Sequence, residues 1–193
     1  MQAELAHVMQ LTLQNPRAAA RHLMDRRLEL STIWLVMALM AVISAGLSTV
    51  SLLLAPPETE AEMIEPAIMA MLQNPLQVAV LQAVVMVIVA MLAQGVGRLF
   101  GGHGNFRDGL VLIVWTEALL CVLQLAQIVL MPVSPSLAAA IGLFGIVLFV
   151  WVLSNFIAEM HSFASAGHVL FGIIATVFAV SVLMTIVLVG MKG

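Results

Sequence analysis

The chain has 193 residues, of which 63% are hydrophobic and only 9% are charged, and its mean hydropathy is +1.14. Soluble domains carry about 25% charged residues, so this composition excludes an ordinary soluble protein and indicates that lipid covers most of the surface. The net charge of −3 gives no indication of a nucleic-acid partner, and the single cysteine, Cys121, excludes an internal disulfide.

Residues 1–29 are predicted to form a cytoplasmic amphipathic segment. Asn15-Pro16 is typical of a helix start, with Asn15 as N-cap and Pro16 in the first turn. Apolar residues then recur at helical spacing on one face, while Arg17, Arg21 and Asp25 lie on another. Such a basic amphipathic helix is expected to lie in the membrane interface against anionic headgroups. The alternative is a short solvated helix that leads into the first span.

Residues 30–193 are predicted to form an all-α integral membrane bundle with five transmembrane helices. Five segments carry the roughly 20 mostly apolar residues that a helix needs to cross a bilayer. Helices are favoured because lipid offers no partners for free backbone polar groups. Proline- or glycine-rich connections separate the spans, which we predict at about 30–55, 76–100, 109–131, 136–159 and 168–191.

The basic residues predict the orientation of the chain. Four arginines lie in the N-terminal segment, and Arg98 and Arg107 flank the glycine-rich loop between the second and third spans. Both regions lie on the same side of a five-span protein, and short loops rich in Lys and Arg favour the cytoplasm. The loop between the first two spans carries four glutamates between Glu58 and Glu65 and no basic residue. We therefore expect a cytoplasmic N-terminus and a C-terminus on the opposite side.

Glu117 is the main candidate for a functional residue within the membrane. It lies eight residues after Gly109, about 12 Å into the third span, where an ionisable side chain is costly and indicates function. Gln124 follows at i+7 and extends a polar stripe along the same face. One interpretation is a proton or ion relay or a substrate contact. The other is a buried glutamate, protonated or paired with Arg98, His161 or a glutamine, that holds helices together.

Other polar residues are weaker candidates. Asn155 lies within the fourth span and is expected to hydrogen-bond to a neighbouring helix, with a ligand contact as the alternative. Imidazole and carboxylate groups near the helix ends are zinc ligands by type, but the spacing of His103, Glu159, His161 and His168 matches no familiar site. We therefore expect no metal and no cofactor. No arrangement of residues typical of catalysis is present, so the chain is not expected to be an enzyme.

Two further groups of residues are expected to make contacts. The first is a set of cytoplasmic side chains that would contact lipid or a partner: Arg17, Arg21, Arg98, Phe106 and Arg107. The loop from Gly101 to Asp108 lacks the lysine and the strand of a phosphate-binding loop. The second group consists of small residues that allow close helix packing in the first, fourth and fifth spans: Ser44, Ser48 and Ser51; Ala138, Gly142 and Gly145; Gly172, Ala175 and Ala179.

Three features resemble the Ypt-interacting protein (YIP) family, in its bacterial branch. They are the segment that begins with Asn15-Pro16-Arg17, the run from Gly101 to Asp108 followed by an apolar helix with Trp115, and the stretch Phe-Ile-Ala-Glu-Met-His-Ser-Phe-Ala-Ser-Ala-Gly from Phe156 to Gly167. The resemblance implies a five-span membrane protein without catalysis in a cell inner membrane, where the orientation expected from the arginines makes the C-terminus periplasmic. Eukaryotic members of the family bind Rab-type GTPases. The chain contains no tyrosine, so none of their binding residues is carried over.

The leading functional hypothesis is a non-enzymatic membrane protein that binds a protein partner or lipids and helps to organise a membrane complex. Its expected partners are the lipid bilayer and another membrane protein or a second copy of the chain. The alternative is a small transporter or channel that uses the polar stripe around Glu117, for which the distinguishing feature would be a wet cavity that reaches Glu117 from one side.

Overall fold

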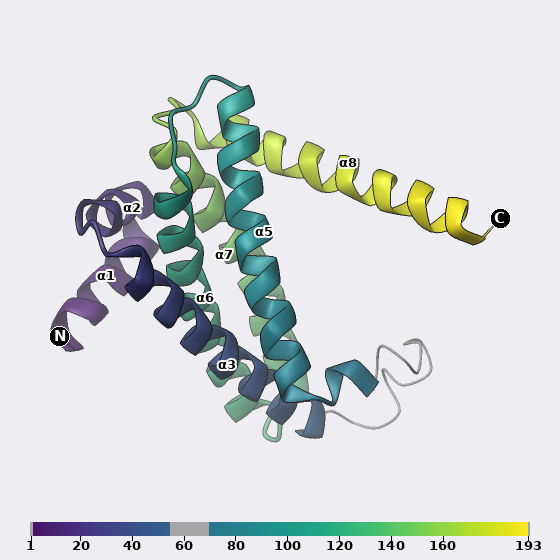
Figure 1. The fold of residues 1–193 in the computed structure, drawn as a ribbon. Helices are drawn as coiled ribbons and strands as arrows, with labels where there is room; N and C mark the ends of the chain where they lie inside the picture. The colour runs from purple at the N-terminus through teal and green to yellow at the C-terminus, as the bar shows by residue number, and fades with distance from the viewer. Residues whose placement is uncertain (1, 55–69, 193) are drawn as a thin grey trace.

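The computed structural model describes residues 2–54 and 70–192, and every regular element within them is a helix. Five of these helices are long and apolar enough to cross a membrane, which confirms the predicted fold class. The acidic residues between Glu58 and Glu65 lie outside the described residues. In chain order the elements are α1 (Gln2–Gln14), α2 (Pro16–Asp25), α3 (Leu30–Leu54), α5 (Pro75–Leu99), α6 (Phe106–Leu130), α7 (Pro135–Met160) and α8 (Ala166–Lys192) (Figure 1).

Asparagine caps begin three of the helices. The side chain of Asn15 accepts a hydrogen bond from the amide of Ala18, as the Asn-Pro pair predicts. The second Asn-Pro pair repeats this chemistry at α5, where Asn74 accepts from the amides of Leu76 and Gln77. Asn105 caps α6 by accepting from the Asp108 amide, so α6 begins three residues before the predicted span. Each cap satisfies amides that the first helical turn leaves without partners.

The ends of α5 and α7 share one backbone motif. Gly102 donates to the carbonyl of Gly97 and Gly101 donates to that of Arg98, with Gly101 at φ +82°. At α7, Phe163 donates to Ala158 and Ser162 donates to Glu159. This is the Schellman motif, whose turning residue is left-handed and usually glycine. In α7 that residue is Ser162, at φ 58°.

Helix α6 occupies the centre of the bundle and packs against α3, α5 and α7. Over its most apolar window 56% of the residues are buried, the largest share of the five candidate spans. Because the α6–α7 connection is only a few residues long, these two helices are antiparallel neighbours. Figure 1 shows α3, α5, α6 and α7 as one bundle, with the loop after α5 at one end and the last turn of α3 and the start of α5 at the other.

The N-terminal helices fold back onto the bundle. The apolar side of α2, including Ala19, Ala20 and Leu23, is buried against α6 and α7. The indole nitrogen of Trp115 in α6 donates to the hydroxyl of Thr12 in α1 across 2.9 Å. Protein therefore covers the apolar face of α2, and its predicted position in the membrane interface stays a prediction.

Helix α8 differs from the other four candidate spans. It packs against α7 near its beginning and then leaves the bundle, so that its far end lies clear of the other helices (Figure 1). Only 6% of its most apolar window is buried. Among its described side chains Val169 is buried, whereas large apolar side chains such as Ile174 and Phe178 are exposed.

Candidate functional site

A pocket of about 450 Å³ lies between α3, α5, α6 and α7. We call it the Glu117 pocket, after the one carboxylate that the described part of the chain contributes to its lining. Its polar side chains come from three helices, and apolar side chains such as Met86 and Phe149 complete the walls. The polar members are Ser44, Ser48, Gln82, Glu117, Gln124 and Gln127.

The polar lining lies in one half of the bundle. Ser44 and Ser48 belong to the second half of α3, and Gln82 belongs to the first third of α5, which runs in the opposite direction. Gln127 lies near the end of α6. These residues therefore lie away from the glycine-rich loop, and Glu117 forms the deep end of the lining, about 16 Å from the start of α6.

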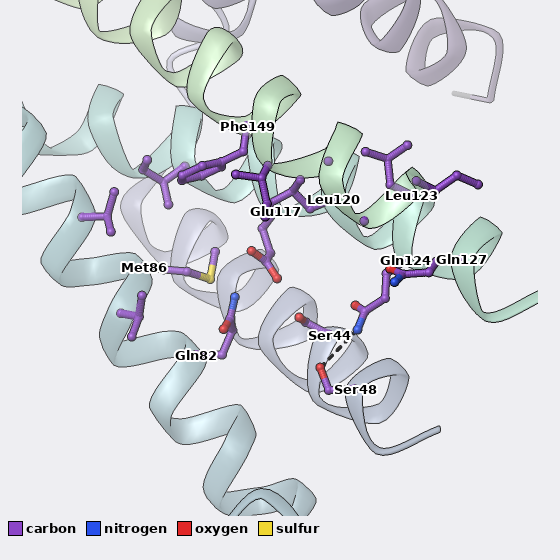
Figure 2. Close-up of a pocket in the computed structure, with 17 residues that line it drawn as sticks. Ser44, Ser48, Gln82, Met86, Glu117, Leu120, Leu123, Gln124, Gln127 and Phe149 are labelled. Atoms are coloured by element: carbon purple, nitrogen blue, oxygen red, sulfur yellow. Dashed lines mark hydrogen bonds between the residues drawn. The ribbon is translucent and has the colours of Figure 1, made fainter. Parts of the chain in front are cut away.

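Glu117 points into this pocket and is only 9% exposed. Figure 2 shows its carboxylate aimed at the space between Gln82 and Ser44, with no hydrogen bond to the side chains drawn around it. Arg98 and His161, the basic partners considered from the sequence, bind elsewhere: Arg98 donates to the carbonyl of Gly104, and His161 contacts Ala93 and Gly104. The acidic group thus faces the pocket without a basic partner among the described residues.

The predicted polar stripe of α6 is present. Gln124 also lines the pocket, and its amide nitrogen donates to the hydroxyl of Ser48 in α3 across 3.2 Å (Figure 2). Gly142 of α7 leaves room for the amide of Gln127, whose nitrogen would lie 3.0 Å from a Cβ at that position. Four of the small-residue positions therefore line this pocket: Ser44, Ser48, Gly142 and Gly145.

Asn155 lies elsewhere on α7 and does not line the pocket. Its amide nitrogen donates to the carbonyl of Trp151 in the same helix across 2.8 Å. The hydrogen bond to a neighbouring helix that the sequence led us to expect is thus replaced by one within α7. The reason is local, because the carbonyl four residues earlier lies within reach of a short amide side chain.

The residues that were predicted to be cytoplasmic gather at the other end of the bundle and contact the chain itself. Arg21 forms an ion pair with Glu159 across 2.8 Å, and this hydrogen bond raises the pKa of Arg21. Arg17 donates to the carbonyl of Ala164. Arg107 donates to the carbonyl of Leu28.

These contacts join three segments that are far apart in sequence: the N-terminal helices, the glycine-rich loop and the α7–α8 turn. Arg98 holds the glycine-rich loop through Gly104, as described above. Phe106 is half-buried and packs against the core. Contact of these residues with lipid or a partner stays a prediction.

His161, at the end of α7, is the centre of a second arrangement that the sequence did not indicate. Its side chain is buried, and a Cβ at Gly97, Gly102 or Gly104 would overlap its ring or press hard against it. The ring stacks on Phe163 with 5.4 Å between centroids. We call this arrangement of one histidine and three glycines the histidine cradle.

The hydrogen bonds of the cradle define the tautomer of His161. Nδ1 accepts from the amide of Gly104, and Nε2 lies 3.0 Å from the carbonyl of Ala93, to which it therefore donates. Burial lowers the pKa of His161, and the positive charge of Arg98 acts in the same direction. The ring is thus held neutral with both nitrogens occupied, so neither is available to bind a metal.

Metal binding has no further support in the described part of the chain. No group of three or more His, Cys, Asp or Glu side chains there is close enough to hold a metal ion. His103 and His168 are exposed and lie outside the cradle.

A glycine-rich loop followed by a distant histidine is the signal that could have identified the cradle. The His161 ring occupies space that is free because Gly97, Gly102 and Gly104 have no side chains. A motif within one segment cannot indicate such a contact. The two segments are about sixty residues apart and meet only when α5, α6 and α7 have packed.

The fold and the pocket define a multi-pass helical membrane protein, with a bundle centred on α6 and no described cluster of metal ligands. The model of the Yip1 domain family matches residues 11–189. The chain belongs to the Yip1 family, as its resemblance to the YIP proteins implied. This family takes part in membrane trafficking and is not enzymatic. A search of curated proteins and a search of solved structures found no match.

Proposed function

We propose that this chain is a non-enzymatic membrane protein that binds a partner membrane protein through α8 and helps to organise a membrane complex. The observation that carries the proposal is the divergence of α8 from the bundle. Its membership of a family that acts in membrane trafficking is consistent with such a role.

The surface of α8 fits a helix partner. Within a membrane, moving an apolar side chain from lipid into a protein interface gains little free energy. Helices therefore associate mainly through the close packing that small residues allow. Gly172, Ala175 and Ala179 recur on one side of α8, and a Cβ at Gly172 would meet nothing within 4 Å. A helix of the partner can therefore approach this side closely without displacing any residue of the bundle.

Cross-linking in native membranes tests this proposal. The chain is cross-linked, purified in mild detergent and analysed by quantitative mass spectrometry, alongside a variant with Ala175→Leu and Ala179→Leu. We expect one membrane protein to be recovered in fixed ratio with the unaltered chain and to be lost from the variant. The matched control is Ala139→Leu with Ala140→Leu, which makes the same change at two exposed alanines of α7. Equal loss from both variants contradicts a specific role for α8, and recovery of only a second copy assigns the interface to self-association.

We further propose a bacterial inner membrane as the site of the protein, with the N-terminus in the cytoplasm and the C-terminus in the periplasm. The support is the gathering of the N-terminal arginines with Arg98 and Arg107 at one end of the bundle. Cysteine labelling tests the orientation, because the sole native cysteine, Cys121, is buried. A membrane-impermeant maleimide should label Ser136→Cys in intact spheroplasts and label His103→Cys only after lysis; the reverse pattern contradicts this orientation.

Transport is a second candidate function, favoured by the Glu117 pocket itself. A pocket that reaches an intramembrane carboxylate is the feature expected of a small transporter or channel. The test is uptake of the transported solute by proteoliposomes that contain the chain. Glu117→Gln should abolish this uptake while leaving the fold intact. A variant that only loses stability would instead assign Glu117 a structural role.

A further inference from the structure

The Glu117 pocket has an unusual balance of charge for a site inside a membrane bundle. Among the described residues its lining includes one carboxylate and no Lys, Arg or His, and the remaining polar members are neutral amides and hydroxyls. Glu117 is more than nine-tenths buried and aims its carboxylate into the space. An ionised carboxylate is costly in such surroundings unless a cation compensates its charge. The occupant that this lining favours is therefore cationic, and anions are disfavoured.

The neutral polar members of the lining each carry an oxygen that can accept a hydrogen bond. Gln124 uses its amide nitrogen to donate to Ser48, which leaves the carbonyl oxygen of Gln124 as an acceptor. Figure 2 shows Gln82 and Ser44 on either side of the Glu117 carboxylate. An ammonium group has three or more N–H donors and needs several acceptors around it. The pocket supplies one charged acceptor and several neutral ones.

The size and the apolar walls of the pocket distinguish an organic cation from a metal ion. A divalent metal such as Ca²⁺ takes six to eight oxygen ligands and usually several carboxylates, whereas this pocket has one carboxylate. Its volume of about 450 Å³ lies within the range of small-molecule sites, which are mainly apolar with a few placed polar groups. Phe149 also lines the pocket, and aromatic faces attract organic cations.

We propose that the Glu117 pocket binds the ammonium group of a small organic amine, with Glu117 as counter-ion and Gln82, Ser44 and Gln124 as neutral acceptors. The apolar part of the amine packs against the walls that include Met86 and Phe149. This site goes beyond the organising role proposed above and stands whether or not α8 binds a partner.

Calorimetric titration of the full chain in phosphatidylcholine nanodiscs tests the proposal, with benzylammonium chloride as the probe. We expect saturable binding, and at least tenfold weaker binding of benzyl alcohol, which keeps the ring and lacks the charge. Glu117→Gln, which keeps the shape of the side chain, should weaken benzylammonium binding at least tenfold. The control Glu29→Gln makes the same change at an exposed carboxylate outside the pocket and should leave the affinity unchanged.

A second arm distinguishes the source of the amine, which is either a free molecule or the ethanolamine headgroup of a lipid. If the affinity for benzylammonium is the same in nanodiscs with and without phosphatidylethanolamine, the site belongs to a free amine. Competition by phosphatidylethanolamine assigns it to the lipid ammonium. Absence of binding in phosphatidylcholine, equal affinity for the alcohol, or full affinity in a folded Glu117→Gln variant overturns the proposal. The alcohol comparison uses the unaltered chain, so it remains decisive if the variant does not fold.

Discussion

Helices α6 and α8 have nearly the same hydropathy and opposite surroundings. Over their most apolar windows the mean hydropathies are 2.1 and 2.2, yet 56% of the window is buried in α6 and 6% in α8. In lipid an apolar side chain has no drive to leave its surroundings, so hydropathy selects a membrane span but does not place it in the bundle. Its position must come from other contacts.

Polar contacts to other helices accompany the burial of α6. In α6, Trp115 reaches Thr12 of α1 and Gln124 reaches Ser48 of α3. In α8, the hydroxyl of Thr176 donates to the carbonyl four residues earlier in its own helix. Helix α6 is thus tied to its neighbours, whereas this polar group of α8 is satisfied locally. Directed polar contacts and small residues arrange helices that are otherwise similar in lipid.

The largest expected effect comes from adding a methyl group where the bundle is most tightly closed. Gly97→Ala places a Cβ against the His161 ring, which two hydrogen bonds hold in place, and we expect a loss of about 3 kcal/mol in the free energy of unfolding. Denaturation in mixed micelles measures this loss. Gly172→Ala in α8 is the matched control, because its Cβ meets nothing within 4 Å. An equal loss of unfolding free energy in the two variants would contradict the difference in packing between α5 at Gly97 and α8 at Gly172.

A smaller effect is expected from removing a core side chain of α6. Leu110 is fully buried, and Leu110→Ala should cost about 2 kcal/mol, mainly through the cavity it leaves, since lipid surrounds the chain before and after unfolding. Ile174→Ala in α8 removes an exposed side chain and should change the free energy of unfolding little. The same denaturation assay measures both. A loss at Ile174 as large as that at Leu110 means that α8 packs within the bundle.

Much of this bundle follows from the sequence because its determinants are local. Apolar runs predict the five spans, and the Asn15-Pro16 pair predicts the cap of α2, since a span and a cap depend on neighbouring residues. Glu117 and Gln124 share a lining because they are seven residues apart on one helix.

Other features depend on which segments meet. The cradle joins Gly97 and Gly104 to a histidine about sixty residues away, and Arg107 donates to the carbonyl of Leu28, which is far away in the sequence. Backbone carbonyls at helix ends are present in every sequence, so no pattern of residues reveals that an arginine will bind them.

Acidification should weaken the closed end of the bundle. Burial lowers the pKa of His161 from its ordinary value of 6.5, so below pH 6.5 the unfolded chain binds a proton that the folded chain does not. Stability should therefore fall as the pH is lowered below 6.5, by at most about 1.4 kcal/mol per pH unit for one group. Denaturation between pH 5 and 7.5 measures the slope. His161→Gln should reduce the slope, and His168→Gln, at an exposed histidine of α8, should not; an unchanged slope in His161→Gln contradicts the assignment.

The smallest expected effect lies at the junction between α7 and α8. Ser162 turns the chain at φ 58°, where a side chain costs about 1 kcal/mol that glycine avoids. Ser162→Gly should therefore raise the free energy of unfolding by up to about 1 kcal/mol. Gly101→Ala, at φ +82° in the same motif after α5, should lower it by a similar amount. A loss of stability in Ser162→Gly would show that the serine side chain contributes more than its backbone conformation costs.

Site-specific photo-cross-linking in native membranes tests the central claim most directly, namely that a partner covers the side of α8 that the chain leaves open. A photoreactive residue is placed at Leu183 in α8, one turn after Ala179, and, separately, at Val147 in α7, whose exposed fractions are 62% and 61%. We predict that the position in α8 forms a discrete protein adduct and that the position in α7 labels only lipid. Lipid labelling alone at both positions, or the same protein adduct at both, would contradict the account.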